Sequence, residues 1–352
     1  MDISEITMGG DTPGIEWRLP VFRFAGKSAD APSVYIQAAL HANELPGTAL
    51  IHFLCGRLRQ AEAEGAIAGD ITIVPHANPI GAAQLHFGEM QGRFDLGSRS
   101  NFNRDFPLIP LGDREKLVEN FDRFSAVDRL KRTLLHMALG ADLVLDLHCD
   151  DESLQYAYID GVFWPGASDL ASALDMEAVF LSDGESSAFE EAVGYAFKNP
   201  GEQRESRLSS QLSVTVELRG TRDVDAATAR KDADGLWRFL AARGIVNDPI
   251  VSLPAYEGPA VPLDNIEMVR AEEPGTVLLY KNVGERVEPG DLLATILTQP
   301  GLANGALEVR ASRAGLIATR TSSRFARRGT KLMKIVCDER ATADRKPGTL
   351  ED

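Results

Sequence analysis

The chain has 352 residues, of which 44% are hydrophobic, and carries a formal net charge of −15. This length and hydrophobic content predict two domains, or one large domain with a smaller one. The acidic balance argues against a nucleic-acid partner, because a negative surface repels phosphate backbones, and no apolar run approaches the roughly 18 residues of a membrane helix.

The cysteine content indicates a reducing compartment. Cys55, Cys149 and Cys337 are widely spaced and odd in number, which argues against a disulfide framework. The first residues, MDISEITMGGDTPG, are acidic and lack the apolar stretch of a signal peptide. We therefore expect a cytoplasmic protein without a membrane partner. The sequence leaves open whether it forms a homo-oligomer.

Short apolar runs alternate with longer amphipathic segments up to about residue 245. The short runs predict strands at residues 33–40, 71–75, 141–147, 156–163, 178–181 and 212–218. The longer segments predict helices at residues 46–64, 113–139 and 225–243. This alternation predicts an α/β fold in residues 1–248, with a mostly parallel mixed sheet flanked by helices.

The composition changes after this region. Residues 249–262 hold four prolines and predict a linker. Residues 263–340 contain two similar β-rich halves, each beginning with Val-Arg-Ala, and predict a small all-β barrel or sandwich. It resembles biotinyl/lipoyl-type carrier domains, although the turn between its halves has no lysine, so we expect a module that flanks or shields the active site. Residues 341–352 are polar and predict a flexible tail.

Two polar residues, His41 and Glu44, directly follow the first predicted strand of this region. Residues at the carboxyl ends of parallel strands face the crevice where ligands bind. Imidazole and carboxylate groups are suited to Zn²⁺. An ordinary histidine beside a helix-start glutamate is the alternative for this pair taken alone.

His148 ends the buried run ADLVLDL and is a third ligand candidate. Asp146 lies two residues earlier on the same side of the strand, where it can orient an imidazole nitrogen. Cys149 points to the opposite face. Two histidines and one glutamate would bind one Zn²⁺ per chain and leave a position for water, which is typical of a catalytic site.

Glu217 lies near the end of a later apolar strand, where a charge is costly without a role or a partner. We predict that it is the general base, with pairing to a nearby arginine as the alternative. Asn103 and Arg104, in NFNRDFP, can hold a substrate carboxylate. Arg93 can stabilise an oxyanion.

The order of these motifs resembles the succinylglutamate desuccinylase/aspartoacylase family of zinc carboxypeptidase-like hydrolases. The resemblance covers roughly residues 30–245. It implies that His41, Glu44 and His148 are zinc ligands and that Glu217 is the catalytic glutamate. It also implies that Asn103 and Arg104 bind the substrate carboxylate. Arg93 would polarise the carbonyl, with Arg99 as its rival.

Some positions depart from the family pattern. Ala42 stands where the first motif usually has glycine, and Leu218-Arg219-Gly220 follows the glutamate. Asp150 and Asp151 follow the second histidine, and we hypothesise that they favour a substrate bearing an amine.

These patterns predict a zinc-dependent amidohydrolase that removes the acyl group from an N-acyl amino acid or a similar small carboxylate-bearing molecule. A carboxypeptidase acting on short peptides is an alternative, because it would use the same groups. A binding module with a degenerate site is the alternative from another class.

Overall fold

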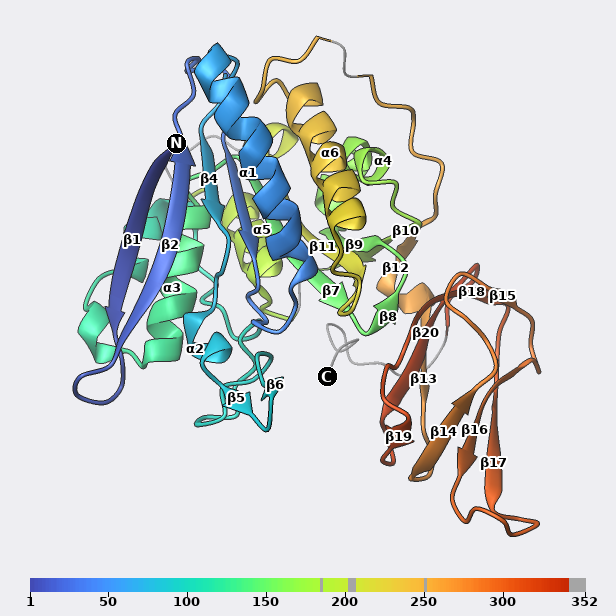
Figure 1. Cartoon of the computed structure of the whole chain (residues 1–352). Coiled ribbons are helices and arrows are strands. Elements are labelled where there is room, and N and C mark those ends of the chain that lie inside the picture. The colour runs from blue at the N-terminus through green and yellow to red at the C-terminus, as the bar shows by residue number, and fades with distance from the viewer. Residues whose placement is uncertain (184–185, 202–206, 250–251, 342–352) are drawn as a thin grey trace.

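The computed structural model describes residues 1–183, 186–201, 207–249 and 252–341. Its centre is a large mixed sheet of nine strands (Figure 1). In spatial order the strands are β1 (Asp2–Gly9), β2 (Glu16–Phe24), β4 (Ile71–Val74), β3 (Val34–Ala38), β7 (Leu143–Asp150), β11 (Leu212–Gly220), β9 (Tyr156–Asp160), β10 (Ala178–Ser182) and β12 (Ala260–Pro262).

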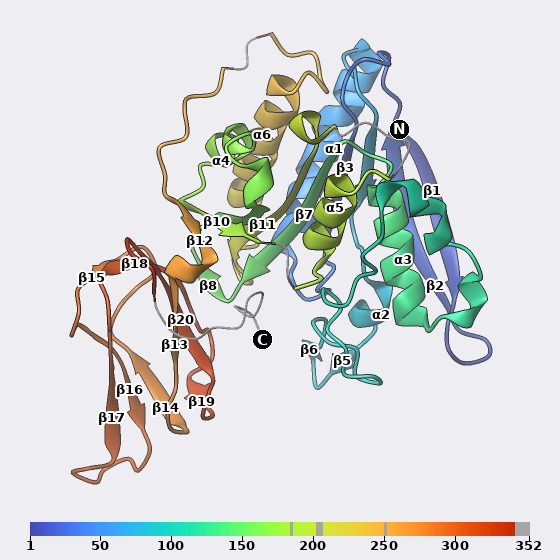
Figure 2. The same cartoon turned by 180° about the vertical axis from the view of Figure 1, so that it is seen from behind.

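Helices cover both faces of this sheet, as Figures 1 and 2 show from opposite sides. One face carries α1 (Pro46–Glu64) and α6 (Ala226–Ala242), and the other carries α3 (Ala126–Ala138) and α5 (Phe189–Lys198). Two short helices, α2 (Pro79–Ala82) and α4 (Ser168–Ala173), complete the layer structure. In the described part of the chain, no helix combines the length and apolar content needed to cross a membrane.

The four central strands β4, β3, β7 and β11 are mutually parallel. Strand β3 is buried along its whole length, as expected for a strand covered by helices on both faces. Because parallel strands end at the same edge, residues at the ends of β3, β7 and β11 meet there. This edge is where the polar motifs lie.

The predicted boundaries of the first helix are confirmed. Pro46 occupies the first turn of α1, and Gly65 ends it in a left-handed conformation with φ of 76°. Asp225 caps α6 by accepting hydrogen bonds from the backbone N–H groups of Ala227 and Thr228.

The single helix predicted at residues 113–139 is wrong. The segment forms two 3₁₀ turns, Leu111–Leu117 and Phe121–Arg123, followed by α3. Asn120 takes a left-handed conformation, and the extended Ser125 caps α3 through the N–H of Asp128. The apolar spacing continued across both breaks, because side chains of separate turns pack on the same core.

Other differences lie at element ends. The strand predicted at residues 156–163 ends at Asp160, which caps the 3₁₀ turn Gly161–Phe163. The last three residues of the proline-rich segment 249–262 form β12, which extends the large sheet beside β10. Strands β1 and β2 and helix α5 were not predicted. The segment predicted as a flexible tail lies outside the described residues from position 342 onward.

The C-terminal region is all-β apart from one 3₁₀ turn, Leu263–Asn265. One sheet contains β13 (Ile266–Arg270), β20 (Lys331–Cys337), β18 (Gly315–Arg320) and β15 (Arg286–Val287). The other contains β17 (Ala306–Arg310), β16 (Leu292–Leu297), β14 (Gly275–Leu279) and β19 (Phe325–Ala326). Both sheets contribute side chains to one apolar core, so they form a sandwich.

The predicted internal repeat is visible in the strand pairing. Each sheet has two central strands from one half of the repeat, flanked by two strands from the other half, and the two sheet orders become identical when the halves are exchanged. Gly275 and Gly315 occupy equivalent positions. A Cβ atom at Gly275 would lie 2.3 Å from the Leu297 carbonyl oxygen, and one at Gly315 would lie 2.5 Å from that of Val336. Close backbone approach therefore requires glycine at both places. The likeness to biotinyl/lipoyl domains stays a prediction.

The β-sandwich packs against the edge of the large sheet where the polar motifs lie (Figure 1). The short strand β8 (Glu152–Ser153), which follows β7, pairs with β18 of the sandwich. An apolar cluster joins both parts; its buried members are Tyr156, Ala178, Phe180, Leu263, Ile266, Ala318 and Val336.

A buried lysine, Lys334, links the sandwich to the large sheet. Its Nζ donates to Asp150 Oδ2 at 2.6 Å, to Tyr156 Oη at 3.0 Å and to Tyr158 Oη at 3.1 Å. Lys334 is only 3% exposed. A buried ammonium is costly without partners, so this network favours one docked arrangement of the two parts.

Replacing Lys334 with methionine is expected to lower the free energy of unfolding by about 3 kcal/mol, because it leaves the Asp150 carboxylate without a cationic partner at the interface. Urea unfolding measures the change. The matched control is Lys281→Met, which removes the more exposed Lys281–Asp291 pair within the sandwich and should cost less than about 1 kcal/mol. Equal effects of both variants would contradict the expected role of Lys334.

Candidate metal centre

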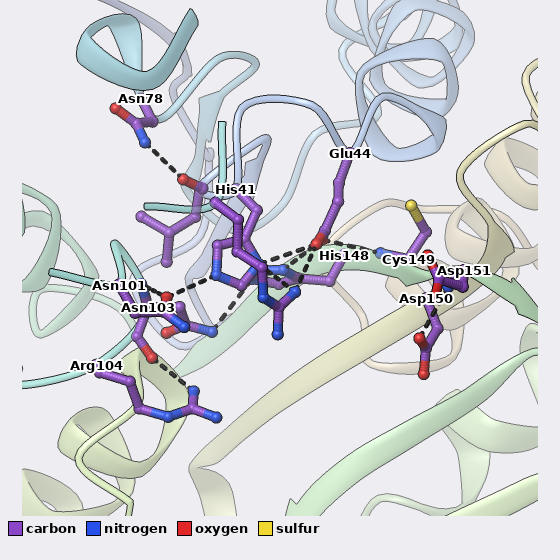
Figure 3. Close-up of polar contacts among 12 residues, drawn as sticks. His41, Glu44, Asn78, Asn101, Asn103, Arg104, His148, Cys149, Asp150 and Asp151 are labelled. Atoms are coloured by element: carbon purple, nitrogen blue, oxygen red, sulfur yellow. Dashed lines mark hydrogen bonds and ion pairs between the residues drawn. The ribbon is translucent and has the colours of Figure 1, made fainter. Parts of the chain in front are cut away.

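Three buried side chains converge at the carboxyl edge of the central strands (Figure 3). One ligand atom each of His41, Glu44 and His148 lies within 4.8 Å of the others. His41 Nδ1 is 2.9 Å from Glu44 Oε1, and His148 Nδ1 is 2.7 Å from Glu44 Oε2. This cluster can hold a metal ion.

The remaining imidazole nitrogens have oxygen partners. His41 Nε2 lies 2.8 Å from Asn101 Oδ1, and His148 Nε2 lies 2.9 Å from Asp146 Oδ2. An N–H at each Nε2 would donate to these oxygens, which leaves the Nδ1 lone pairs directed at the centre. The donor set therefore fits a metal ion. The expectation that Asp146 orients His148 is confirmed, whereas Asn101 was not singled out from the sequence.

The turn after β3 brings His41 and Glu44 together. Ala39 adopts a left-handed conformation with φ of 58°, which turns the chain sharply after the strand. Asn78 braces the turn by donating from Nδ2 to the Leu40 carbonyl oxygen at 2.8 Å. Glu44 then lies just before α1, with its carboxylate between the two imidazoles (Figure 3).

A buried hydrogen-bond chain supports His148 from behind. Tyr35 Oη donates to Gln37 Oε1 at 2.8 Å, and Gln37 Nε2 donates to Asp146 Oδ1 at 3.0 Å. The other oxygen of Asp146 accepts from His148. All these side chains are buried, so the orientation of the imidazole is fixed by packed neighbours.

Replacing Asp146 with asparagine is expected to weaken zinc binding by about 10- to 100-fold, because the carboxylate that holds His148 Nε2 is lost. Competition with a chromogenic chelator measures the affinity. Asp142→Asn is the control, since Asp142 lies just before the other end of β7 and contacts Ser33. Unchanged zinc affinity in the Asp146 variant would contradict the role of this contact.

Arg93 lies against the cluster. Its guanidinium is 3.2 Å from Glu44 Oε1 and 3.3 Å from His41 Nδ1. Arg93 also lines the main pocket, whereas Arg99 is exposed and does not. This geometry favours Arg93 over Arg99 as the arginine that acts at the site.

Asn103 and Arg104 line the same pocket as the cluster. The side chain of Asn103 is buried; Nδ2 lies 3.4 Å from His148 Nε2, and Oδ1 accepts the backbone N–H of Phe189 at 2.8 Å. Arg104 donates to the Asn103 carbonyl oxygen at 2.7 Å. The structure thus brings both residues of the predicted carboxylate pair to the pocket.

Glu217 extends from β11 beside His148, its partner in the strand register. It lines the pocket, and its Oε2 is buried without a hydrogen bond. Burial, reinforced by the negative charge of Glu44, raises the pKa of Glu217 well above its ordinary value. A raised pKa matches a carboxylate that accepts a proton near neutral pH.

Both acidic residues after His148 accept hydrogen bonds from other side chains. Asp150 accepts from Lys334 and from Tyr156 Oη, and Asp151 is exposed and accepts from Ser322. Because Asp150 is already paired with Lys334, the hypothesis that one of these two residues binds a substrate amine is disfavoured for Asp150. Burial raises the pKa of the Cys149 thiol, which argues against a thiolate ligand at this position.

Several pocket residues were not predicted from the sequence. They are Tyr158, Ser182, Ser186, Ala188, Glu190, Glu191, Thr215 and Leu263. Thr215 could have been found, because it lies two residues before Glu217 on the same strand face. Glu190 and Glu191 lie in the first turn of the unpredicted helix α5, and no local signal placed them near the metal ligands.

The model of the succinylglutamate desuccinylase/aspartoacylase catalytic domain matches residues 30–243. The chain belongs to this family. The match includes every predicted site residue, and the predicted family is confirmed. Members of this family are generally hydrolases that remove acyl groups.

Solved structures give the same result. A succinylglutamate desuccinylase/aspartoacylase family protein from Shewanella amazonensis is 27% identical, with a TM-score of 0.84 over 96% of this chain and 99% of that chain. Another from Shewanella frigidimarina is 25% identical, with a TM-score of 0.83 over 96% and 97%. An ectoine utilization protein from Ruegeria pomeroyi shares the fold at 19% identity, with a TM-score of 0.69 over 95% and 94%. No match was found among the curated proteins.

Proposed function

We propose that this chain is a zinc-dependent amidohydrolase that removes the acyl group from an N-acyl amino acid or a similar small carboxylate-bearing substrate. The observation that carries the proposal is the meeting of three ligand side chains with Glu217, Arg93 and the Asn103–Arg104 pair in one pocket. Zinc, when bound, would supply a Lewis acid that polarises the amide carbonyl and lowers the pKa of a water.

The side chains of the pocket have separate roles in the reaction. Glu217 is the general base, which takes a proton from the attacking water and delivers it to the leaving nitrogen. Arg93 stabilises the negative charge that develops on the carbonyl oxygen, because its guanidinium lies beside the cluster. Arg104 and Asn103 grip the carboxylate of the amino-acid product and hold the amide bond near the water.

The position of the β-sandwich favours a small substrate over a long peptide. Leu263, at the start of the sandwich, lines the pocket together with Tyr158, which contacts Lys334. These two side chains line the sandwich side of the pocket and favour a compact acyl amino acid, so deacylation is preferred to carboxypeptidase action.

The direct test is a panel of N-acetyl and N-succinyl amino acids, with matched dipeptides, incubated with the zinc-loaded protein. Release of free amines is expected from at least one acyl amino acid and is expected to stop when a chelator removes the metal. Faster cleavage of dipeptides would favour the carboxypeptidase alternative. No cleavage of any compound by zinc-loaded protein would contradict the proposal and favour a binding module.

Replacing Arg104 with methionine is expected to raise KM by about 10- to 100-fold with a smaller change in kcat, because a charge-assisted contact to the substrate carboxylate is lost. Steady-state kinetics on the best substrate separates the two constants. Arg132→Met is a suitable control, since Arg132 stacks on Phe124 outside the pocket. A KM equal to that of the wild type would remove Arg104 from substrate binding.

A further inference from the structure

One wall of the pocket carries buried polar atoms without partners. They are Oε2 of Glu190 and Oγ of Ser182, and the Thr215 hydroxyl lies beside the Glu190 carboxyl. Glu190 and Ser182 are each 7% exposed, and Thr215 is 4% exposed. Buried polar atoms are normally paired, so such atoms in the lining of one pocket point to a polar group that binds beside them.

Three different elements supply this wall. Ser182 ends β10, Thr215 lies on β11, and Glu190 lies in the first turn of α5. Helix α5 is fixed on both sides of Glu190. The Phe189 N–H donates to Asn103 Oδ1 at 2.8 Å, and Ser213 Oγ donates to the Glu190 carbonyl oxygen at 2.8 Å. The wall is therefore rigidly joined to the predicted carboxylate-binding pair.

Acidic groups act directly on Glu190, while the Arg104 guanidinium acts on the neighbouring Glu191. Burial, the neighbouring Glu191 and the more distant Asp146 raise the pKa of Glu190 to about 8. A hydrogen bond between the Thr215 side chain and the Glu190 carboxyl opposes this rise only in part. Glu191 is occupied, because its Oε2 accepts from the backbone and hydroxyl of Ser186. A positive charge that entered this pocket would therefore stabilise the ionised form of Glu190.

We infer that Glu190, Ser182 and Thr215 form a subsite for an ammonium group on the side chain of the amino acid that is released. This inference rests on the proposed function and narrows its substrate class to N-acyl derivatives of amino acids with cationic side chains.

The chemistry of the wall matches an ammonium group. An ammonium has three N–H donors and no acceptor, and an ionised carboxylate and hydroxyl oxygens can only gain from accepting such donors. A second substrate carboxylate would raise the pKa of Glu190 further instead of stabilising its ionised form. The substrate α-carboxylate has its own partner in Arg104, so the two ends of a basic amino acid would bind at different places in one pocket.

The test compares a charged substrate with a neutral one of the same shape. Zinc-loaded protein is given Nα-acetyl-L-ornithine and N-acetyl-L-norleucine, which differ by an ammonium in place of a methyl group. We expect kcat/KM to be about 10- to 100-fold higher for the ornithine compound, as for a charge-assisted hydrogen bond. In Glu190→Gln, which keeps the shape of the side chain, the ratio should fall to within about threefold.

Binding of the free products supplies a readout that does not depend on hydrolysis. Calorimetry should show tighter binding of L-ornithine than of L-norleucine to the zinc-loaded protein, and Glu190→Gln should remove the difference. Glu115→Gln is the control, because Glu115 is exposed and pairs with His136 outside the pocket. Thermal unfolding and zinc content establish that both variants are folded and loaded.

The outcomes separate this inference from the proposed function. Selective ornithine binding that depends on Glu190, without cleavage of any acyl compound, would support the subsite and overturn the hydrolase proposal. Cleavage with equal preference for both compounds would support the hydrolase and overturn the subsite. A preference for ornithine that persists in Glu190→Gln would also overturn the assignment of Glu190.

Discussion

Replacing Glu217 with glutamine is expected to lower kcat by about 10²- to 10⁴-fold while the chain keeps its metal. Glutamine has nearly the same shape but cannot take a proton from water. Glu217 faces the pocket and is not one of the three residues of the ligand cluster, so metal binding should persist. The measurements are kcat on the best acyl amino acid and metal content by plasma mass spectrometry.

Glu177→Gln is the matched control for this variant. Glu177 lies just before β10, at the opposite end from Ser182, where it accepts the backbone N–H of Gln155. The Glu177→Gln variant should keep kcat within about twofold of the wild-type value, as for a substitution away from the site. Full activity in Glu217→Gln would mean that another group acts as the base. Loss of metal from it would mean that Glu217 is a ligand.

Replacing His148 with alanine is expected to reduce zinc from about one ion per chain to near zero and to abolish hydrolysis. The variant removes one of three ligands and leaves Glu44 without the imidazole that lies 2.7 Å away. Protein purified without chelator and then dialysed with zinc gives the metal content directly. The measurement does not depend on knowing the substrate.

His136→Ala is the control for the ligand variant. His136 lies on α3 and pairs with Glu115 at the surface, so its loss should not change the zinc content. Equal zinc in wild type and His148→Ala would place the metal elsewhere. No zinc in either protein after zinc has been offered would contradict the metal-dependent mechanism.

Much of the site could be predicted because its residues follow regular elements. His41 and Glu44 come just after β3, and His148 and Glu217 lie near the ends of β7 and β11. A parallel arrangement of these strands is predicted by the alternation of strands and helices, and it brings their carboxyl ends to one edge. Each candidate residue could therefore be recognised from its local sequence, and the closeness of these residues in space followed from the parallel arrangement of their strands.

The contacts around the site were harder to predict from the sequence. Asn101 reaches His41 from a loop, and Lys334 reaches Asp150 from the sandwich, 184 positions later. Such pairs depend on how two surfaces pack, and nothing in either local sequence encodes the partner. The broken helix has the same cause, since residues on separate turns can pack on one core and imitate a continuous apolar stripe.

The sequence by itself determined the α/β pattern, the ends of α1, the two-fold repeat of the β-sandwich and the metal-ligand candidates. Each of these depends on periodicity, capping or motif order, which are properties of neighbouring residues. The tertiary structure alone decided that Glu190, Ser182 and Thr215 share a wall of the pocket. They come from α5, β10 and β11, and only the packing of α5 on the sheet brings them together.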